Sequence, residues 1–116
     1  MSRHVLAVDL KDDPQVIAAY VDHHRQVWPE VLRSLRAAGI DDMEIVLLGR
    51  RLVMIVETKG DFKSAFARHV SSDPRVTQWE ALMKSMQEPP PGRAAGEWWA
   101  VMEPIFRLTA AERCPT

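Results

Sequence analysis

Residues 43–57 of the chain read MEIVLLGRRLVMIVE. Two runs rich in aliphatic and β-branched residues, Met43 to Leu48 and Arg51 to Glu57, flank the dipeptide Gly49-Arg50. Runs of this kind are typical of strands, and a two-residue connection that contains glycine is typical of a tight hairpin. The stretch therefore predicts two neighbouring antiparallel strands, with glycine where the turn is expected to need a positive φ.

A strand and a helix are predicted before this hairpin. Val5 to Leu10 is a short apolar run with the composition of a first strand. Asp13 and Pro14 are the residue types preferred at the cap and the first position of a helix. We therefore expect a helix to begin there and to continue its apolar pattern to Val27.

Pro29 interrupts that helical pattern. Proline lacks the N–H that a helix interior requires, and it disfavours helical geometry at Trp28. The sequence thus predicts either a kink at Trp28-Pro29 or a second helix that begins at Pro29. Gly39 is well placed to end this helical region.

Two further helices and a last strand are predicted after the hairpin. Asp61 is a suitable cap for a helix up to Val70, and the pair Asp73-Pro74 repeats the start signal of the first helix. The run Glu88 to Gly92 holds three prolines and predicts a stiff connection. Glu97 to Leu108 is expected to form the last strand.

The predicted order of strand, helix, strand, strand, helix and strand is that of the ferredoxin-like fold. We expect an α+β domain, βαββαβ, in which helices cover one face of a four-stranded antiparallel sheet. A single domain should span residues 1–116, with 111–116 as a loose tail. The strands are apolar on both faces, as the neighbours Ile45 and Val46 illustrate, so the uncovered face is expected to pack on a second copy in a symmetric dimer.

The composition is that of an ordinary globular domain: 47% of the 116 residues are hydrophobic, 27% are charged and the net charge is −1. Nucleic acid is not expected as a partner, because phosphate binding requires clustered lysine and arginine. The sequence shows no run with the apolar length of a signal-peptide core or a membrane span, so a cytoplasmic location without membrane association is expected. The single cysteine, Cys114, predicts neither a disulfide nor a metal site.

The stretch YVDHHRQVWPE, residues 20–30, has an unusual mixture of side chains. Tyr20, His24 and Trp28 are four apart, so on one continuous helix they would share a face. An imidazole exchanges protons near neutral pH, since its unperturbed pKa is about 6.5. The alternative is a core histidine that only makes a hydrogen bond. The neighbouring phenol favours His24 as an acid–base residue assisted by Tyr20, and Trp28 is assigned to shaping the pocket because Pro29 should redirect it.

Carboxylates within the strand-like runs are a second group of candidates. Glu44, Glu57 and Glu103 have apolar neighbours, and a buried carboxylate needs a hydrogen-bond partner or a ligand. An ion pair with an arginine is the simpler interpretation for each. Glu103 is the best candidate for a ligand contact, because Met102 and Pro104 isolate it.

The neighbours Trp79 and Glu80 form a third candidate group. Core packing is the simpler interpretation of Trp79, and a solvated helix position is the simpler interpretation of Glu80. The sequence contains no Gly-rich phosphate loop, nucleophile motif, Cys–His pairing or metal-ligand cluster. A reaction of this chain is therefore expected to need no metal and no cofactor, only binding and proton transfer.

The pattern Tyr20-x-x-x-His24-x-x-x-Trp28-Pro29-Glu30 resembles the signature of the L-rhamnose mutarotase family. The resemblance extends from Val5 to Leu108 through Gly39, the hairpin, Gln78-Trp79 and Ile105-Phe106. It implies a small cofactor-free homodimer with the ferredoxin-like fold known as the dimeric α/β barrel, which interconverts the α and β anomers of a 6-deoxy sugar. It also implies that His24 is the catalytic proton donor and that Tyr20 assists it.

Two positions depart from the rhamnose enzymes, which carry a tyrosine in place of Met43 and a tandem Trp-Trp in place of Trp79-Glu80. The second change replaces a stacking surface with a carboxylate that can bind hydroxyls, whose stereochemistry separates one 6-deoxyhexose from another. The segments 42–45 and 79–83 are more similar to the branch associated with L-fucose. The predicted substrate is L-fucose or L-rhamnose. The residues predicted to bind it are Trp79, Glu80, Met43, Trp28 and Glu103.

Two other functions remain open, because one fold supports many activities. Dimeric ferredoxin-like proteins include cofactor-free monooxygenases and haem-binding proteins, and a haem protein would need an axial histidine facing an open pocket. The chain could instead be a non-catalytic dimer that binds a small molecule. In that case His24→Ala would leave ligand affinity nearly intact, with no rate enhancement to lose.

Overall fold

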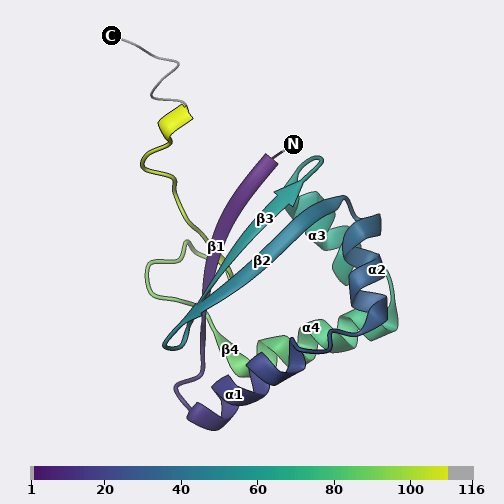
Figure 1. Cartoon of the computed structure of the whole chain (residues 1–116), viewed down its shortest axis with the longest axis vertical. Coiled ribbons are helices and arrows are strands. Elements are labelled where there is room, and N and C mark those ends of the chain that lie inside the picture. The colour runs from purple at the N-terminus through teal and green to yellow at the C-terminus, as the bar shows by residue number, and fades with distance from the viewer. Residues whose placement is uncertain (1, 110–116) are drawn as a thin grey trace.

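The computed structural model describes residues 2–109. Its elements, labelled in Figure 1, follow in the order β1 (Ser2–Leu10), α1 (Pro14–His23), α2 (Pro29–Ala37), β2 (Ile40–Leu48), β3 (Arg51–Thr58), α3 (Phe62–Val70), α4 (Pro74–Met86), β4 (Gln87–Glu88) and β5 (Ala100–Val101). The loose tail predicted at 111–116, with Cys114, lies outside the described residues.

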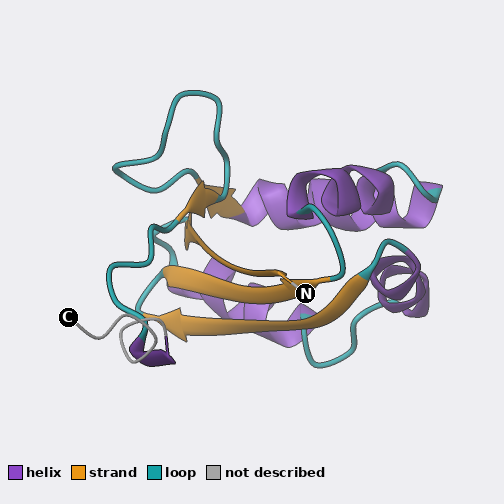
Figure 2. Cartoon of the chain, turned by 90° about the horizontal axis from the view of Figure 1, so that it is seen from above, coloured by secondary structure: helices purple, strands orange, loops and turns teal. Residues whose placement is uncertain are grey.

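The predicted hairpin lies at one edge of an antiparallel sheet. β2 and β3 pair along their lengths, and Gly49 takes the expected positive φ, 61°, in the turn between them. β3 also pairs with β1, from Ser2 opposite Thr58 to Asp9 opposite Arg51, and Figure 2 shows the long strands side by side. The strand order β2-β3-β1-β4, with β5 also on β1, is the ferredoxin-like order, so the predicted fold class is confirmed.

The aspartate caps form as predicted. Asp13 and Asp73 each accept a hydrogen bond from the backbone N–H two residues further on, at 2.9 and 2.7 Å, and a proline follows each cap. Asp61 accepts from the backbone N–H and the hydroxyl of Ser64, and these hydrogen bonds lower the pKa of Asp61. Gly39, with φ 97°, follows α2.

The first helix is shorter than predicted. α1 ends at His23 and His24 is its C-cap, whereas the apolar pattern predicts a helix to Val27. Trp28 has an extended conformation (φ −59°, ψ 136°) and Pro29 begins α2, which is one of the two predicted alternatives. The chain therefore leaves the helix before Trp28, and Trp28 does not share a helical face with Tyr20 and His24, as Pro29 predicts.

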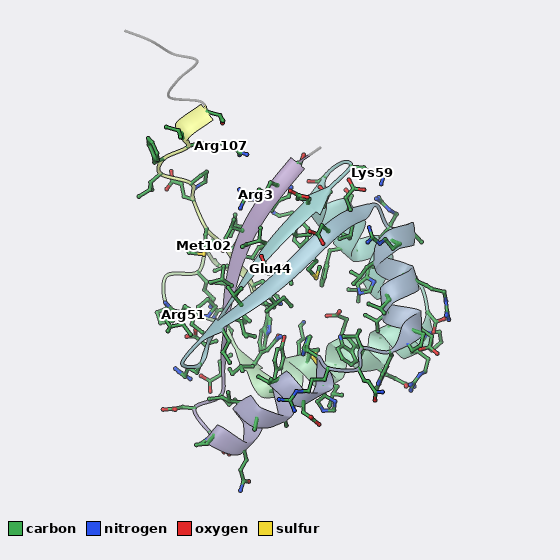
Figure 3. The ribbon with its side chains drawn as sticks, in the orientation of Figure 1. Arg3, Glu44, Arg51, Lys59, Met102 and Arg107 are labelled. Carbon is green, nitrogen blue, oxygen red and sulfur yellow. The ribbon has the colours of Figure 1, made fainter. Side chains whose placement is uncertain are left out.

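The last strand is also shorter than predicted. Only Ala100–Val101 pairs with β1, and the N–H of Met102 then bonds to the carbonyl of Val5 at 2.8 Å. Residues 102–107 leave the sheet instead of forming the expected strand to Leu108, because Pro104 has no N–H to pair with. Met102 and Arg107 mark this departing segment in Figure 3.

The two faces of the sheet differ in their covering. Side chains that alternate along β1 and β3 pack into the core with the helices, among them Val8, Leu52 and Val56. Figure 1 shows the helices to the right of and below the strands, whereas the C-terminal segment leaves at the upper left. On the opposite face apolar groups remain accessible: Val46 of β2 is 45% exposed and Leu48 is 85% exposed.

Candidate active site

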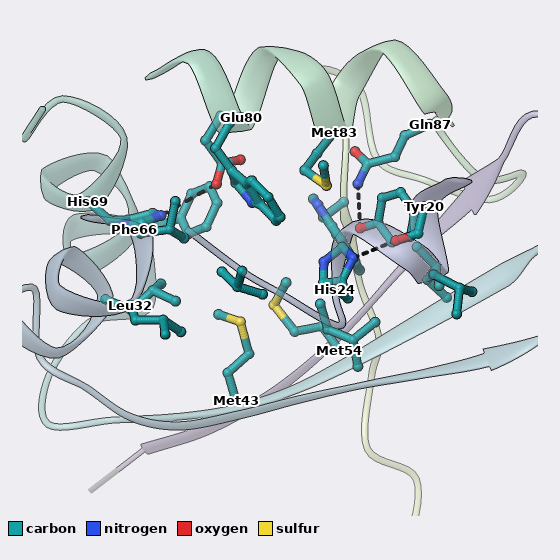
Figure 4. A pocket seen from close by; sticks show the side chains of 18 of the residues that line it. Tyr20, His24, Leu32, Met43, Met54, Phe66, His69, Glu80, Met83 and Gln87 are labelled. Carbon is teal, nitrogen blue, oxygen red and sulfur yellow. Dashed lines mark hydrogen bonds and ion pairs between the residues drawn. The ribbon is translucent and has the colours of Figure 1, made fainter. Parts of the chain in front are cut away.

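A cavity of about 510 Å³ lies between the inner face of the sheet and the helices. This volume falls within the range of small-molecule sites, roughly 300–1,000 Å³. Residues from α1, α2, β2, β3, α3 and α4 line it, as do Gln87 of β4 and Trp99. Figure 4 shows two groups of polar side chains, one around His24 and Tyr20 and one around His69 and Glu80, at opposite ends of the view.

His24 is held by the end of the helix that precedes it. Its Nδ1 lies 2.8 Å from the backbone carbonyl oxygen of Tyr20, one turn earlier. A carbonyl oxygen can only accept, so Nδ1 carries the hydrogen. In the neutral imidazole the lone pair is then on Nε2, which is available to a molecule in the cavity.

Tyr20 is 2% exposed, and its hydroxyl is oriented by two further residues. The indole N–H of Trp98 donates to Gln87 Oε1 at 2.9 Å, which fixes the orientation of the amide because indole is only a donor. Gln87 Nε2 therefore donates to Tyr20 Oη, at 3.0 Å. The phenol oxygen is the acceptor in this bond, so its own hydrogen is available to an acceptor in the cavity.

Burial keeps this phenol neutral. Desolvation raises the pKa of Tyr20 to about 12, with a smaller contribution from the charge of Glu80, while the hydrogen bond from Gln87 acts in the opposite direction. At neutral pH the cavity thus presents a phenol O–H beside an imidazole, with ring centroids 4.5 Å apart. A proton donor and a proton acceptor stand together at one end of the cavity.

The two tryptophans predicted for the site, Trp79 and Trp28, occupy different positions. Trp79 lines the cavity and meets the ring of His24 edge-on at a centroid distance of 5.5 Å. Trp28 does not line the cavity: it packs edge-on against Trp79 at 5.2 Å, and the Arg75 guanidinium lies 3.8 Å from its ring centroid. The structure therefore places Trp28, a predicted substrate-binding residue, behind Trp79 and not on the cavity wall, because α1 ends before it and Pro29 begins α2.

The remaining walls are largely apolar. Met43 of β2, Met54 of β3 and Met83 of α4 line the cavity and are labelled in Figure 4. Flexible thioether side chains adapt well to an irregular apolar ligand surface. The site can therefore bind a compact molecule that has an apolar side, and it can exchange protons with that molecule.

The model of the L-rhamnose mutarotase family matches residues 3–108 of the chain. A protein of Xanthomonas campestris pv. campestris named L-fucose mutarotase is 44% identical over 114 residues, which are 96% of this chain and 91% of that protein. The chain belongs to the L-rhamnose mutarotase family. This membership confirms the predicted resemblance and the predicted enzyme class, an isomerase that acts on sugar anomers.

Solved structures agree with this mutarotase fold. The L-rhamnose mutarotase of Formosa agariphila matches with a TM-score of 0.68 at 19% identity, over 93% of this chain and 99% of that one. A dimeric ferredoxin-like protein from an uncultured marine organism matches with a TM-score of 0.51 at 20% identity, over 71% of this chain and 81% of that one. At these identities the likeness concerns the fold alone.

Glu103 lies outside the cavity that holds His24 and Tyr20. It is exposed, on the segment that leaves the sheet after β5, and it borders a separate hollow with Arg3, His4 and Arg107. The structure does not bring Glu103 to this cavity as predicted, because the strand expected to carry it inward ends at Val101. The other residues predicted for catalysis or substrate binding all line the cavity: Tyr20, His24, Met43, Trp79 and Glu80.

Two polar residues of the cavity, His69 and Gln87, were not predicted. His69 occupies an inward position of α3, three residues after Phe66, so the test applied to His24 would also have selected it. Gln87 follows the last helix directly and stands in a two-residue strand, and the sequence pattern gives no signal for its role. Within residues 2–109 no helix is long and apolar enough to cross a membrane.

Proposed function

We propose that this member of the L-rhamnose mutarotase family interconverts the α and β anomers of a 6-deoxyhexose, with L-fucose preferred, and that His24 and Tyr20 exchange the protons. One observation carries the proposal. The hydrogen bond from His24 Nδ1 to a carbonyl leaves Nε2 as the acceptor, and the hydrogen bond from Gln87 leaves the Tyr20 hydrogen to be donated. Both groups face the same cavity.

Ring opening of a cyclic hemiacetal requires these two transfers. The bond between C1 and the ring oxygen breaks, the hydroxyl on C1 loses its hydrogen to become a carbonyl, and the ring oxygen gains a hydrogen. His24 Nε2 takes the first hydrogen and Tyr20 Oη gives the second, while the Gln87 N–H stabilises the charge that develops on Oη. After rotation about the C1–C2 bond the reverse transfers close the ring on the other face, and His24 then donates its proton to the oxygen on C1.

Two observations support L-fucose as the sugar. Glu80 places a carboxylate at the end of the cavity away from His24 (Figure 4), where it can accept hydrogen bonds from ring hydroxyls. The relative from Xanthomonas campestris, named L-fucose mutarotase, is 44% identical to this chain. The methyl group of a 6-deoxy sugar would pack against the methionines of the wall.

We further propose that the chain forms a homodimer through the uncovered face of the sheet. Val46 and Leu48 on this face are accessible in the single chain, and burial of apolar surface favours association. Residues 102–107 leave the sheet and expose Ile105 (96%) and Phe106 (72%), which add further apolar surface. A cytoplasmic location stays a prediction, which cell fractionation can test.

Saturation-transfer NMR tests the catalytic proposal. Exchange between the α and β signals of L-fucose and L-rhamnose should be accelerated by the protein at micromolar concentration. His24→Gln should lower this acceleration by about 10²-fold or more, since general acid–base catalysis is typically worth about 10²–10⁴. The matched control is His23→Gln, which changes the neighbouring histidine.

Three results would count against the proposal. If the wild-type protein accelerates exchange of no sugar, the protein is not a mutarotase in solution. If His24→Gln and His23→Gln lower the rate equally, the reaction does not use His24. If His24→Gln leaves sugar affinity intact and no acceleration exists in either protein, the non-catalytic binding function is the better description.

A further inference from the structure

A second polar cluster lies at the end of the cavity away from His24. It consists of Glu80 on α4, His69 on α3, Ser34 on α2 and Ser72 just after α3. His69 and Glu80 line the cavity, and Ser34 lies behind His69. Residues from three helices, α2, α3 and α4, thus meet at a single imidazole, and His69 and Glu80 are labelled in Figure 4.

The imidazole of His69 has a partner on each nitrogen. Its Nε2 lies 3.4 Å from Glu80 Oε1, and its Nδ1 lies 2.8 Å from Ser34 Oγ. Ser34 Oγ in turn lies 2.6 Å from Ser72 Oγ. His69 is 1% exposed, and a buried imidazole needs such partners for its polar nitrogens.

The hydrogen bonds of this polar cluster have a preferred donor and acceptor at each contact. The Ser72 hydroxyl donates to the backbone carbonyl oxygen of His69 at 2.8 Å. The Ser34 hydroxyl, 2.8 Å from His69 Nδ1 and 3.2 Å from the same carbonyl oxygen, can donate to Nδ1, and the imidazole hydrogen then falls on Nε2, where it faces Glu80. In the opposite tautomer a lone pair on Nε2 would face a carboxylate oxygen, and two acceptors would oppose each other. The Glu80 carboxylate opposite Nε2 therefore favours the tautomer that directs an N–H toward Glu80, and Ser34 supplies the donor that this tautomer needs at Nδ1.

We propose that His69 is a positioning residue for Glu80, and that the carboxylate held in this way reads the hydroxyl configuration at C4 of the sugar. This inference rests on the proposed mutarotase function. In this proposal the N–H on His69 Nε2 orients Glu80 through Oε1, 3.4 Å away, and leaves Oε2 to accept from the sugar. Glu80 touches the sugar, whereas His69, Ser34 and Ser72 act through it.

The shape of a pyranose decides which hydroxyls are read. His24 and Tyr20 must contact C1 and the ring oxygen, so a ring that extends along the cavity presents C3 and C4 toward Glu80. L-Fucose carries its C3 and C4 hydroxyls on the same side of the ring, where one carboxylate can accept from both. In the C4 epimer, 6-deoxy-L-glucose, the two hydroxyls lie on opposite sides.

The test compares L-fucose with 6-deoxy-L-glucose and uses the ratio of their kcat/KM values for anomeric exchange. The ratio does not depend on the fraction of folded enzyme. Glu80→Gln should lower the ratio by about 10- to 100-fold, the value of a hydrogen bond to a charged group. Ser34→Ala removes the hydroxyl that donates to His69 Nδ1, so the imidazole is no longer held in one tautomer. This variant should lower the ratio by about 2- to 10-fold, the value of a neutral hydrogen bond.

Ser71→Ala is the matched control, because the Ser71 hydroxyl donates to the carbonyl of Ala67 at 2.9 Å and lies outside the chain of contacts. It should keep the wild-type ratio. The inference is overturned if the wild-type enzyme does not prefer L-fucose, if Glu80→Gln keeps the ratio, or if Ser34→Ala matches Ser71→Ala. Absence of exchange with every sugar would instead refute the proposed function, so the two failures are distinguishable.

Discussion

Gln87→Glu tests the proton donor of the proposed reaction with a change of a single functional group. Gln87 is 3% exposed and connects the indole of Trp98 to the hydroxyl of Tyr20. In the variant, Trp98 can still donate to one carboxylate oxygen. The other oxygen faces Tyr20 Oη at the distance of the present hydrogen bond, 3.0 Å. When the new carboxyl is ionised it can only accept, so the hydrogen between these two oxygens must come from Tyr20.

The magnitude follows from what Tyr20 loses. Its pKa of about 12 keeps the phenol protonated at neutral pH, so the wild-type enzyme always has this hydrogen to donate. In Gln87→Glu the hydrogen is bound to the new carboxylate and the ring oxygen of the sugar loses its donor. A hydrogen bond to a group that develops charge is worth about 1.5–3 kcal/mol, which corresponds to about 10- to 100-fold in rate.

A double-mutant cycle tests whether Gln87 acts only through the Tyr20 hydroxyl. Anomeric exchange of L-fucose is measured by NMR for Tyr20→Phe, for Gln87→Glu and for the combination. If Gln87 acts only through the phenol, each single variant loses about the same factor and the double variant loses no more. Gln26→Glu, an exposed change of the same type, is the control. Full activity in Gln87→Glu, or losses that multiply in the double variant, would refute the reasoning.

Two further predictions concern stability and assembly. The hydrogen bond and charge of Arg51 hold the pKa of Asp9 below its usual value. Between the folded and the unfolded pKa of Asp9, the folded chain binds fewer protons than the unfolded chain, so the free energy of unfolding rises with pH. Urea unfolding at fixed protein concentration measures how much stability is lost as the pH falls through the acidic range. This loss should be smaller in Asp9→Asn than in Asp12→Asn, and equal losses would contradict the assignment to Asp9. Val46→Asp should convert the proposed dimer to a monomer in light scattering, while Ala18→Asp on the outer side of α1 should not; a dimer that persists in Val46→Asp would exclude this face as the interface.

Local sequence signals determined the order and the ends of most elements. Asp13 and Asp73 cap helices because a carboxylate satisfies orphan N–H groups wherever a helix starts, and this chemistry involves only neighbouring residues. Gly49 and Gly39 take positive φ for an equally local reason. Tyr20 and His24 could be selected because the cavity side of α1 carries an unusual pair of side chains four residues apart.

The tertiary structure decided everything that depends on distant partners. The role of Gln87 exists only because β4 brings it beside Tyr20, 67 positions away. Ser34, His69 and Glu80 are ordinary residues on three separate helices until packing joins them. Glu103 and the strand expected to carry it were misplaced because pairing to β1 ends at Val101, and strand pairing is a property of two segments. A sequence pattern records which groups a chain has, but hydrogen-bond direction and burial, which decide their chemistry, arise only after distant segments meet.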